Sequence, residues 1–465
     1  MLGAVISLIA TIITAYYLIK RYQAQIVLLV AGLGLMLVAV LLLGAGPEAI
    51  LPAKVKSTGF IGFDLVKFVE RTFSARVAGL GLIIMSAGGF ATYMDHIGAS
   101  KAMVFSLIGP LQKLRSPYLV LALAFIIGSV LKIFITSASG LSMLLMVTIY
   151  PVIVALGASP VAAAAMVVTC GAFDTGPAGG NSNLGAASSS LDIMVYFVNY
   201  QLPATVAGWV TMAVLHYFSQ QYFDKKDKIG ALYGTQADNR LDTDAIEENK
   251  VAMPPKFYVI LPALPLILLL VFSSFGYNKV KLDVVTAMLL CFLFTICCEF
   301  IRFRDARKVF KDSMVFYMTM GKMFGAVITM VVAGEVFAKG LMATGTIDLL
   351  INTAKGAGFG PFAMTLTMTL FIIISAIVMG GGNAPFFAFA ALAPKIAGEV
   401  GFPAVYIVLP MQLSCGICRT ITPISAVMIA VSGVAGIHPF DLLRRTIIPA
   451  GGGLIVSTIV ALAIG

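Results

Sequence analysis

The sequence predicts an all-α polytopic membrane protein with two inverted repeats of about five transmembrane helices, each carrying a re-entrant helical hairpin and a broken helix. Three observations predict this class. Hydrophobic residues make up 60% of the 465 residues, charged residues only 11%, and mean hydropathy is +1.00. About ten segments are long and apolar enough to cross a bilayer. Finally, the segment around residues 87–175 recurs around residues 332–420.

The internal repeat keeps prolines, glycines and cysteines in register. The matched pairs are Pro151 and Pro394, Pro160 and Pro403, Gly89 and Gly334, and Cys170 and Cys415. The paired prolines are 243 residues apart, whereas the paired glycines and cysteines are 245 apart. Two small gaps in the alignment of the two copies account for this difference. Asp174 and Arg419 occupy equivalent positions, so the two copies carry opposite charges there. Matching helix breaks in the two halves of a hydrophobic chain indicate a secondary transporter and its substrate site.

The expected spans lie near residues 3–19, 26–45, 77–97, 160–190, 203–220, 257–276, 282–301, 317–341, 403–430 and 445–464. We expect the first span to be retained, because no positive residue precedes it and no convincing cleavage site follows it. Residues 117–156 and 359–400 are too long for one span, and each has a polar or glycine-rich interruption. We interpret them as the first and second hairpins. The chain therefore divides into a first repeat (1–222), a linker (223–256) and a second repeat (257–465).

Basic residues in the loops set the expected orientation. They are Lys20, Arg21, Lys101, Lys113, Arg115, Lys225, Lys226, Lys228, Arg302, Arg304, Arg307, Lys308, Lys311, Arg444 and Arg445. The positive-inside rule places them and the linker in the cytoplasm, with both termini outside. Five spans per half is an odd number, which inverts the second repeat. The net charge of +10 belongs to these loops, so we expect no nucleic-acid partner.

Two amphipathic segments precede spans in matching places. Residues 58–76 mix phenylalanines with acidic and basic side chains, and residues 302–316 mix apolar side chains with five basic ones. We expect each to form an arm along the membrane interface. An ordinary juxtamembrane loop is the alternative.

Each hairpin tip combines small polar residues with a helix start. The expected substrate contacts here are Thr136, Ser137, Ser139, Gly140, Gly382, Asn383 and Ala384. Ser139 and Asn383 suit the N-cap of the returning helix, with Pro385 in the first turn of the second one. Helix starts within the bilayer require a protein-enclosed cavity, where their N–H groups and partial positive charge suit a carboxylate. Two tips suit the two ends of a dianion.

The two helix breaks complete the candidate site. Their expected substrate contacts are Asp174, Thr175, Arg419, Thr420, Thr422 and Ser425. A guanidinium at membrane depth costs several kcal/mol unless it is paired or faces water, and its planar fork matches a carboxylate. A permanent structural pair with Asp174 is the alternative for Arg419. For Asp174 three roles stay open: carrying a coupling proton, neutralising Arg419, or contacting a substrate amino group.

Glu335 is a second coupling candidate. It lies in an apolar segment, and the equivalent residue of the first half is Phe90. A carboxyl group in apolar surroundings can be neutral near pH 7 and carry a proton. A hydrogen-bonded structural acid is the alternative. We expect a proton, or alternatively sodium, as coupling ion, and no other cofactor.

Enzyme and metal chemistry lack their usual patterns. The three histidines show no HExxH spacing, so we expect no zinc site. Cys415 and Cys418 have CxxC spacing but lie within a predicted span, and Ser139 lacks a histidine in a matching helix to activate it. A channel would need a continuous polar path that the sequence does not show. We therefore predict a carrier and not an enzyme.

Several segments together carry a resemblance to a known family. They are Arg76–Leu82, Tyr93–Met94, His96–Ser100, Ile135–Leu141, Val331–Gly340, Met379–Phe386, and Arg419 with Pro423. Across nearly the whole chain they resemble the anaerobic C4-dicarboxylate carriers of the DcuC and DcuD type. The resemblance implies carriage of succinate, fumarate or malate across the bacterial inner membrane by proton-coupled symport, exchange or efflux.

The wider ion-transporter superfamily that the chain resembles implies a homodimer with an elevator mechanism. The chain departs from the family pattern between Cys170 and Asn183. An acid at Asp174 is awkward beside a dianion, so an amino-bearing dicarboxylate or a monocarboxylate is the alternative substrate.

Overall fold

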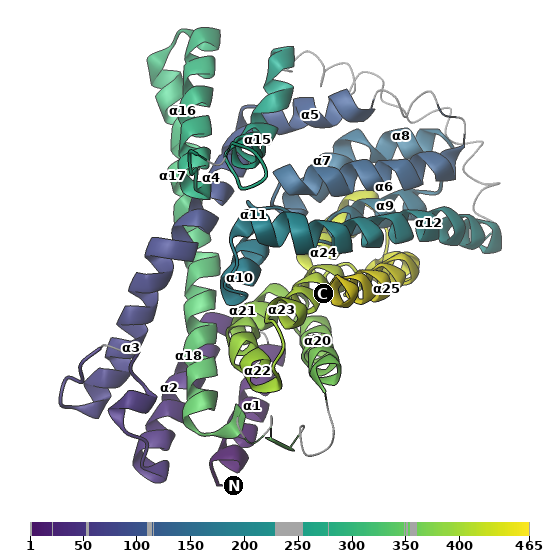
Figure 1. Ribbon diagram of the computed structural model, residues 1–465. Coiled ribbons are helices and arrows are strands. Elements are labelled where there is room, and N and C mark those ends of the chain that lie inside the picture. The colour runs from purple at the N-terminus through teal and green to yellow at the C-terminus, as the bar shows by residue number, and fades with distance from the viewer. Residues whose placement is uncertain are drawn as a thin grey trace.

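The computed structural model describes residues 2–20, 22–52, 55–108, 114, 116–227, 254–277, 279–347, 349, 352–353 and 360–464. These residues form helices joined by turns and loops, with no strand among them (Figure 1). The all-α class is therefore confirmed. Most of the expected linker, residues 228–253, lies outside the described residues.

The first half of the chain contains α-helices, labelled α, and short 3-10 or π-helices, labelled η. In chain order they are α1 (Leu2–Ile19), α2 (Ala24–Leu43), η1 (Pro47–Ala49), α3 (Ile61–Arg76), η2 (Val77–Gly81), α4 (Leu82–His96), α5 (Ala99–Ile108), α6 (Pro117–Phe134), α7 (Ala138–Thr148), α8 (Tyr150–Ala155), α9 (Pro160–Cys170), α10 (Gly180–Ser188), α11 (Ile193–Val195), η4 (Tyr196–Gln201) and α12 (Leu202–Lys226).

The second half has a similar order of elements. They are η6 (Lys256–Ala263), α15 (Leu264–Val271), α16 (Val284–Phe303), α17 (Ala306–Met323), η7 (Phe324–Ile328), α18 (Thr329–Ala343), α20 (Pro361–Met379), α21 (Asn383–Phe389), η8 (Ala390–Leu392), α22 (Ala393–Val400), α23 (Val405–Cys418), α24 (Ala426–Ala435) and α25 (Pro439–Ala463). Each half thus has a long helix with a π-helical segment, then a hairpin, then a broken helix. The inversion of the second repeat stays a prediction.

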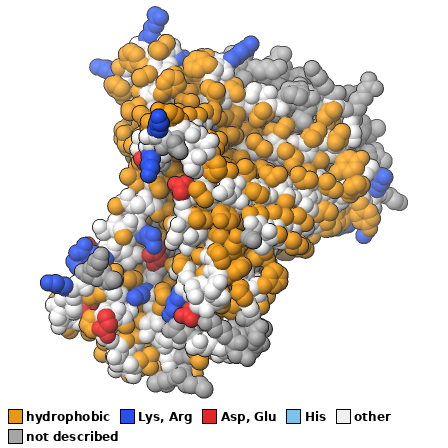
Figure 2. All heavy atoms as spheres, in the orientation of Figure 1, with side chains coloured by type: hydrophobic (Ala, Val, Ile, Leu, Met, Phe, Trp, Pro, Cys, Tyr) orange, Lys and Arg blue, Asp and Glu red, His pale blue; other side chains and the backbone are white. Residues whose placement is uncertain are grey.

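The surface of the described residues is suited to lipid. Six helices are long and apolar enough to cross a membrane: Ala24–Leu43, Ile61–His96, Pro117–Phe134, Val284–Phe303, Ala306–Ala343 and Pro439–Ala463. Large apolar side chains such as Ile12, Leu293 and Ile301 are exposed, and orange covers most of the face in Figure 2. The predicted span at 203–220 lies in α12, a 25-residue helix. The protein is a multi-pass membrane protein.

The two predicted arms continue directly into their spans. Residues 61–96 form one helical run of 36 residues and residues 306–343 one of 38. At 1.5 Å per residue they are about 54 and 57 Å long, well beyond a hydrocarbon core of about 30 Å. The first run is kinked at Gly79 (φ −99°, ψ −105°). The expected boundary at residues 316 and 317 is wrong, because α17 passes through it without a break.

Figure 1 shows two groups of helices that differ in direction. The first, which we call the frame, contains α2, α3, α4, α16, α17 and α18, with α17 packed on α4 and α18 packed on α2. The second, which we call the body, contains both hairpins, both broken helices, α12 and α25; α12 packs on α6 and α25, and α20 packs on α23. The candidate site lies where the body meets the frame.

Both hairpins have the predicted helix, break and helix. In the first, α6 is followed by α7 and α8, which lie beside it (Figure 1). In the second, α20 is followed by α21, η8 and α22, and α21 contacts α20. Pro151 and Pro394 lie in the first turns of α8 and α22. They explain why both returning arms are divided, because proline has no N–H to bond to the preceding turn and its ring clashes with the carbonyl group there. Whether the hairpins are re-entrant in a membrane stays a prediction.

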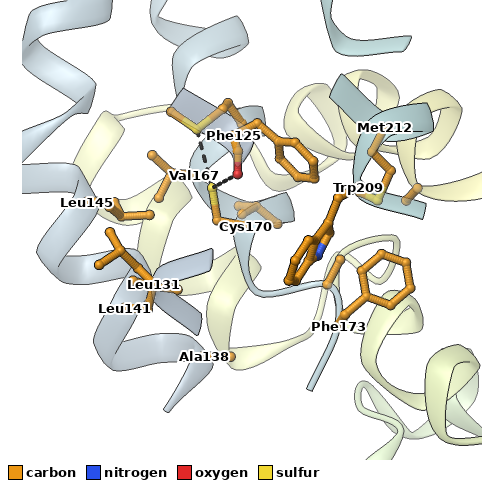
Figure 3. Close-up of a cluster of buried hydrophobic side chains, with 14 of the residues drawn as sticks. Phe125, Leu131, Ala138, Leu141, Leu145, Val167, Cys170, Phe173, Trp209 and Met212 are labelled. Carbon is orange, nitrogen blue, oxygen red and sulfur yellow. Dashed lines mark hydrogen bonds between the residues drawn. The ribbon is translucent and has the colours of Figure 1, made fainter. Parts of the chain in front are cut away.

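The first hairpin is held to the body by close packing. Figure 3 shows Phe125, Leu141 and Val167 around Cys170, with Trp209 directed toward Phe173. The Cys170 thiol points to the Phe125 carbonyl oxygen, 3.8 Å away. Helices in lipid associate mainly through such van der Waals packing, which small residues favour, and α9 contributes four consecutive buried alanines, 162–165. The first hairpin, α9 and α12 therefore form one packed unit.

A buried ion pair joins α12 to α25 at the other end of this unit. Arg445 Nη1 lies 2.6 Å from Asp224 Oδ1, with side chains 2% and 3% exposed. Ser159 at the start of α9 and Tyr118 in α6 also donate to Asp224, at 2.7 and 3.0 Å. The Asp224 carboxylate thus links four helices, α6, α9, α12 and α25.

Replacing Arg445 should destabilise the protein far more than replacing its neighbour. Arg445→Met leaves Asp224 buried without its countercharge, which should lower the free energy of unfolding by about 3–5 kcal/mol. Arg444→Met is the matched control, because Arg444 is 45% exposed and pairs with Asp227 at the surface, where a pair contributes about 0–1 kcal/mol. Thermal unfolding of the purified variants measures both. Equal losses in the two variants would contradict the account of this cluster.

Candidate functional site

The hairpin tips and helix breaks meet around one cavity of about 560 Å³, which we call the central cavity. Its wall includes Thr136, Ser137, Ser139, Asp174, Asn181, Gly382, Asn383, Ala384, Arg419 and Ser425 from the body, and Gly88, Asp95, Met323 and Met330 from the frame. Small-molecule sites in proteins commonly enclose roughly 300–1,000 Å³. The cavity is therefore large enough for a small organic acid.

Four residues predicted as contacts do not line this cavity. The Thr420 and Thr422 hydroxyls instead donate to the carbonyl oxygens of residues 417 and 418, at 2.8 and 2.7 Å. Thr175 is buried, and Gly140 contributes its N–H group to the cap of α7. The other predicted contacts lie on the wall of the central cavity.

The caps at the tips differ from the prediction by one or two residues. Gly140 N–H donates to Ser137 Oγ at 3.0 Å, so Ser137 and not Ser139 is the N-cap of α7. Ser137 has the extended backbone that a cap needs (φ −76°, ψ 115°). In the second hairpin α21 begins at Asn383, and Gly382 precedes it as the N-cap without a side-chain bond. The Asn383 side chain is thereby available for contacts across the site.

Glycine allows the second tip to lie directly against the broken helices. A Cβ at Gly382 would overlap the backbone of Cys415. A Cβ at Gly416, the next residue of α23, would overlap the carbonyl oxygen of Ala172 in the first break. The second tip and both breaks are thus in backbone contact.

Three charged side chains form the centre of the site. Arg419 Nη1 donates to Asp174 Oδ1 at 3.2 Å and Arg419 Nη2 donates to Asp174 Oδ2, a bidentate pair. Lys132 Nζ, from α6 of the first hairpin, lies 3.0 Å from Asp174 Oδ1. The side chains of Arg419, Asp174 and Lys132 are 11%, 10% and 2% exposed. Two cations face one acid, so the centre has an excess of positive charge.

Two amides connect this charged centre to the second tip. Arg419 Nη2 donates to Asn383 Oδ1 at 3.0 Å. Asn181 Nδ2 donates to Asp174 Oδ2 at 2.6 Å and to Asn383 Oδ1 at 3.1 Å. The guanidinium is therefore oriented by groups from both repeats.

Lys132 was not predicted from the sequence, although it carries a signal. It is the only charged residue of α6 (Pro117–Phe134), whose other side chains are almost all apolar. An ionisable residue at membrane depth is a functional candidate by default. Its Nζ also donates to the Thr136 carbonyl oxygen at 2.6 Å, so it connects the first tip to the charged centre.

Buried amides satisfy the backbone at the first break. The Asp174 carbonyl oxygen accepts bonds from Gln201 Nε2, Gln412 Nε2 and Ser182 Oγ, each at 3.0 Å. Gly176 N–H donates to Gln201 Oε1 at 3.1 Å. Non-helical backbone at membrane depth requires such internal partners. Gln201 and Gln412 were also missed. A glutamine within an apolar span is a recognisable signal, which applies to Gln412 in the predicted span at 403–430, whereas Gln201 lies just before the span at 203–220.

Similar bonds support the second break. Ser425 Oγ donates to the Arg419 carbonyl oxygen at 2.6 Å and accepts from Met428 N–H at 3.2 Å, which makes Ser425 the N-cap of α24. Thr446 of α25 donates to the Thr420 carbonyl oxygen at 2.7 Å. The predicted polar residues of this break thus mainly hold the backbone, while Arg419 reaches the cavity.

Glu335 lies away from this centre. Its Oε1 atom is 2.5 Å from Arg76 Nε, and its side chain is 14% exposed. It lines a different cavity from the one that contains Asp174. Within the described residues, no group of three or more His, Cys, Asp or Glu side chains is arranged to hold a metal ion.

Sequence comparisons cover almost the entire chain. The family profile described as "DcuC: C4-dicarboxylate anaerobic carrier" matches residues 2–464. The anaerobic C4-dicarboxylate transporter DcuC of Escherichia coli K12 is 35% identical over 451 residues, which cover 97% of this chain and 94% of that protein. A probable anaerobic C4-dicarboxylate transporter of Vibrio cholerae is 34% identical over 456 residues, covering 98% and 96%.

Solved structures of two transporters share the fold. MtrF of Neisseria gonorrhoeae, described among antimetabolite efflux pumps, has a TM-score of 0.57 at 12% identity, covering 96% of this chain and 94% of its own. The YdaH transporter of Alcanivorax borkumensis has a TM-score of 0.57 at 15% identity, covering 94% and 98%. Both likenesses concern the fold alone.

Gly382→Ala should destabilise the site, whereas Gly381→Ala should not. A methyl group at Gly382 meets the Cys415 backbone, and nothing lies within 4 Å of a Cβ at Gly381. Overpacking of this kind costs about 1–3 kcal/mol. Thermal unfolding of both variants measures the difference. If the two variants have the same melting temperature, the close contact between the second tip and α23 is not a constraint on the fold.

Proposed function

This chain belongs to the DcuC family of C4-dicarboxylate anaerobic carriers, and we propose that it transports C4-dicarboxylates such as succinate, fumarate and malate by a secondary active mechanism. The family and its members are transporters and not enzymes. The observation that supports the substrate class is the excess of positive charge beside two hairpin tips. Location in the bacterial inner membrane with periplasmic termini, and assembly as a homodimer, belong to the same proposal.

One substrate carboxylate would bind to Arg419. The guanidinium fork matches a carboxylate, and Asn383 holds the fork in place through the bond to Nη2. An arriving carboxylate competes with Asp174 for this fork. The second carboxylate would lie toward the first tip, where Ser137, Ser139 and the start of α7 line the cavity and a helix N-terminus favours negative charge.

Charge balance favours a coupled proton on Asp174. With Lys132 and Arg419 protonated and Asp174 ionised, the centre carries one net positive charge. A bound dianion leaves one net negative charge, and a proton on Asp174 brings the loaded centre to neutrality. Asp95, on the frame side of the cavity, adds an acid that makes an excess anion still less favourable. Symport of a dianion with at least one proton therefore suits this site.

The same balance bears on the alternative substrates. A monocarboxylate would neutralise the centre without a proton, so it would bind without Asp174 changing its charge. An amino-bearing dicarboxylate would need Asp174 as a partner, yet Asp174 already accepts bonds from Arg419, Lys132 and Asn181. Because the charge of Lys132 compensates the acid at Asp174, a dianion can bind to Arg419 beside it. The simple dicarboxylate is the substrate class we favour.

Alternating access would come from movement of the body against the frame. The central cavity is bounded by both groups of helices, while the charged centre and both tips belong to the body alone. Movement of the body would therefore carry the site as a unit, in the manner of an elevator. The packed core around Cys170 and the four-helix contact at Asp224 support such rigid motion.

Transport of labelled succinate into proteoliposomes tests this function. An inside-alkaline pH gradient should accelerate uptake by the wild type. Arg419→Gln should lower uptake at least tenfold, because loss of a charged hydrogen-bonded partner costs about 2–5 kcal/mol, and Arg419→Lys should recover part of it, since it keeps the charge without the fork. Arg307→Gln, at an exposed arginine of α17, is the control with wild-type rates.

Two results would oppose the proposal. Wild-type protein that moves none of succinate, fumarate or malate, under a gradient or in exchange, is not a C4-dicarboxylate carrier. Unchanged uptake by Arg419→Gln would remove Arg419 from the site even if transport is confirmed.

A further inference from the structure

A second cavity, of about 240 Å³, lies between the frame and the returning arm of the second hairpin. Its charged wall residues are Arg76 of α3 and Glu335 and Lys339 of α18, and its apolar wall includes Phe68, Met342 and Pro394. It shares no wall residue with the central cavity. The proposed transport mechanism does not use it.

The two cavities lie on opposite sides of one contact. On α18, Met330 lines the central cavity, whereas Glu335 and Lys339 line the second one. Between them a Cβ at Gly334 would overlap the backbone of Ala388, so α18 and α21 are in backbone contact there. The same order holds along the second hairpin, where Phe387 lines the central cavity and Pro394 the second. An anion that passes this contact would leave one cavity and enter the other.

Positive charge is in excess in the second cavity. Arg76 pairs with Glu335 at 2.5 Å, and the Arg76 side chain remains 37% exposed. Lys339, one helical turn beyond Glu335, makes no ion pair or hydrogen bond with any other residue in the described ranges. Figure 2 shows basic and acidic side chains together in the strip between the two parts of the molecule.

The Lys339 ammonium group is half-buried on the wall of this cavity, and removing a charge from water is costly unless the charge is paired. Lys339 has an acid on the same helix, but that acid is held by Arg76. A bound anion would supply the missing countercharge and could contact Arg76 at the same time. The apolar side chains of Phe68 and Met342 would suit a short carbon chain next to the charged end.

We propose that this second cavity is an additional anion-binding site in which Lys339 and Arg76 bind a carboxylate-bearing substrate, separated from the central cavity by the contact between α18 and α21. The identity of the carboxylate rests on the proposed function. The anionic headgroup of a lipid offers similar chemistry, so the test must separate the two sources.

Equilibrium binding of labelled succinate to the full-length protein in nanodiscs of phosphatidylcholine tests the site. The wild type should saturate at two succinates per chain. Lys339→Gln should halve this amount, and Lys339→Arg should restore it. Arg419→Gln should also halve it, by removing the other site. Lys322→Gln, an exposed lysine of α17 outside both cavities, should match the wild type.

A second arm measures retention of phosphatidylglycerol by native mass spectrometry for the wild type and Lys339→Gln. Retention that depends on Lys339, without any Lys339-dependent succinate binding, would assign the anion site to a lipid and remove the substrate from it. If Lys339→Gln changes neither succinate nor lipid binding, the proposal is overturned. Succinate binding that Arg419→Gln abolishes and Lys339→Gln leaves intact would refute the second site while supporting the proposed function.

Discussion

The contact of Asp174 with Arg419 and Lys132 is the interaction on which the rest of the site depends. It joins three segments that are far apart in the sequence: the first hairpin, the first break and the second break. Asp174 is the countercharge of both cations, and each cation would be costly in an apolar surrounding without it. The first hairpin and both breaks therefore meet at this point, which joins the two halves of the chain. The same centre leaves one positive charge uncompensated, which is the property that an anion carrier needs.

Irregular backbone in the buried centre of the site is possible because its polar groups have internal partners. The Asp174 carbonyl oxygen alone accepts three hydrogen bonds, from Gln201, Gln412 and Ser182. At the second break, serine and threonine hydroxyls have this role. Among the predicted polar residues, Thr420 and Thr422 bond to backbone carbonyl oxygens, whereas most of the others line the central cavity. Glycines at the crossing points let backbones approach where side chains would overlap.

Much of this arrangement was predictable because it is periodic or repeated. The apolar spans, the two hairpins and the breaks at Asp174 and Arg419 follow from hydropathy and from the matched prolines and glycines. The caps were displaced because either Ser137 or Ser139 can cap a helix, and only the backbone conformation decides between them. The partners of Asp174 were not predictable in full, since Lys132 carries a signal of its own but no sequence spacing relates it to an acid 42 residues later. The pairing of Glu335 with Arg76 is likewise a tertiary contact between two long helices. Each helix continues through a π-helical segment, which was not predicted because the charged residues suggested a boundary there.

The central claim is that a dianion replaces Asp174 as the partner of Arg419 while Asp174 binds a proton. The most direct measurement is the number of protons absorbed from a weakly buffered solution when purified protein binds succinate. The account predicts net uptake of a proton by the wild type and none by Asp174→Asn, with succinate binding retained in that variant. Succinate binding without proton uptake in the wild type, or equal uptake in Asp174→Asn, would contradict it.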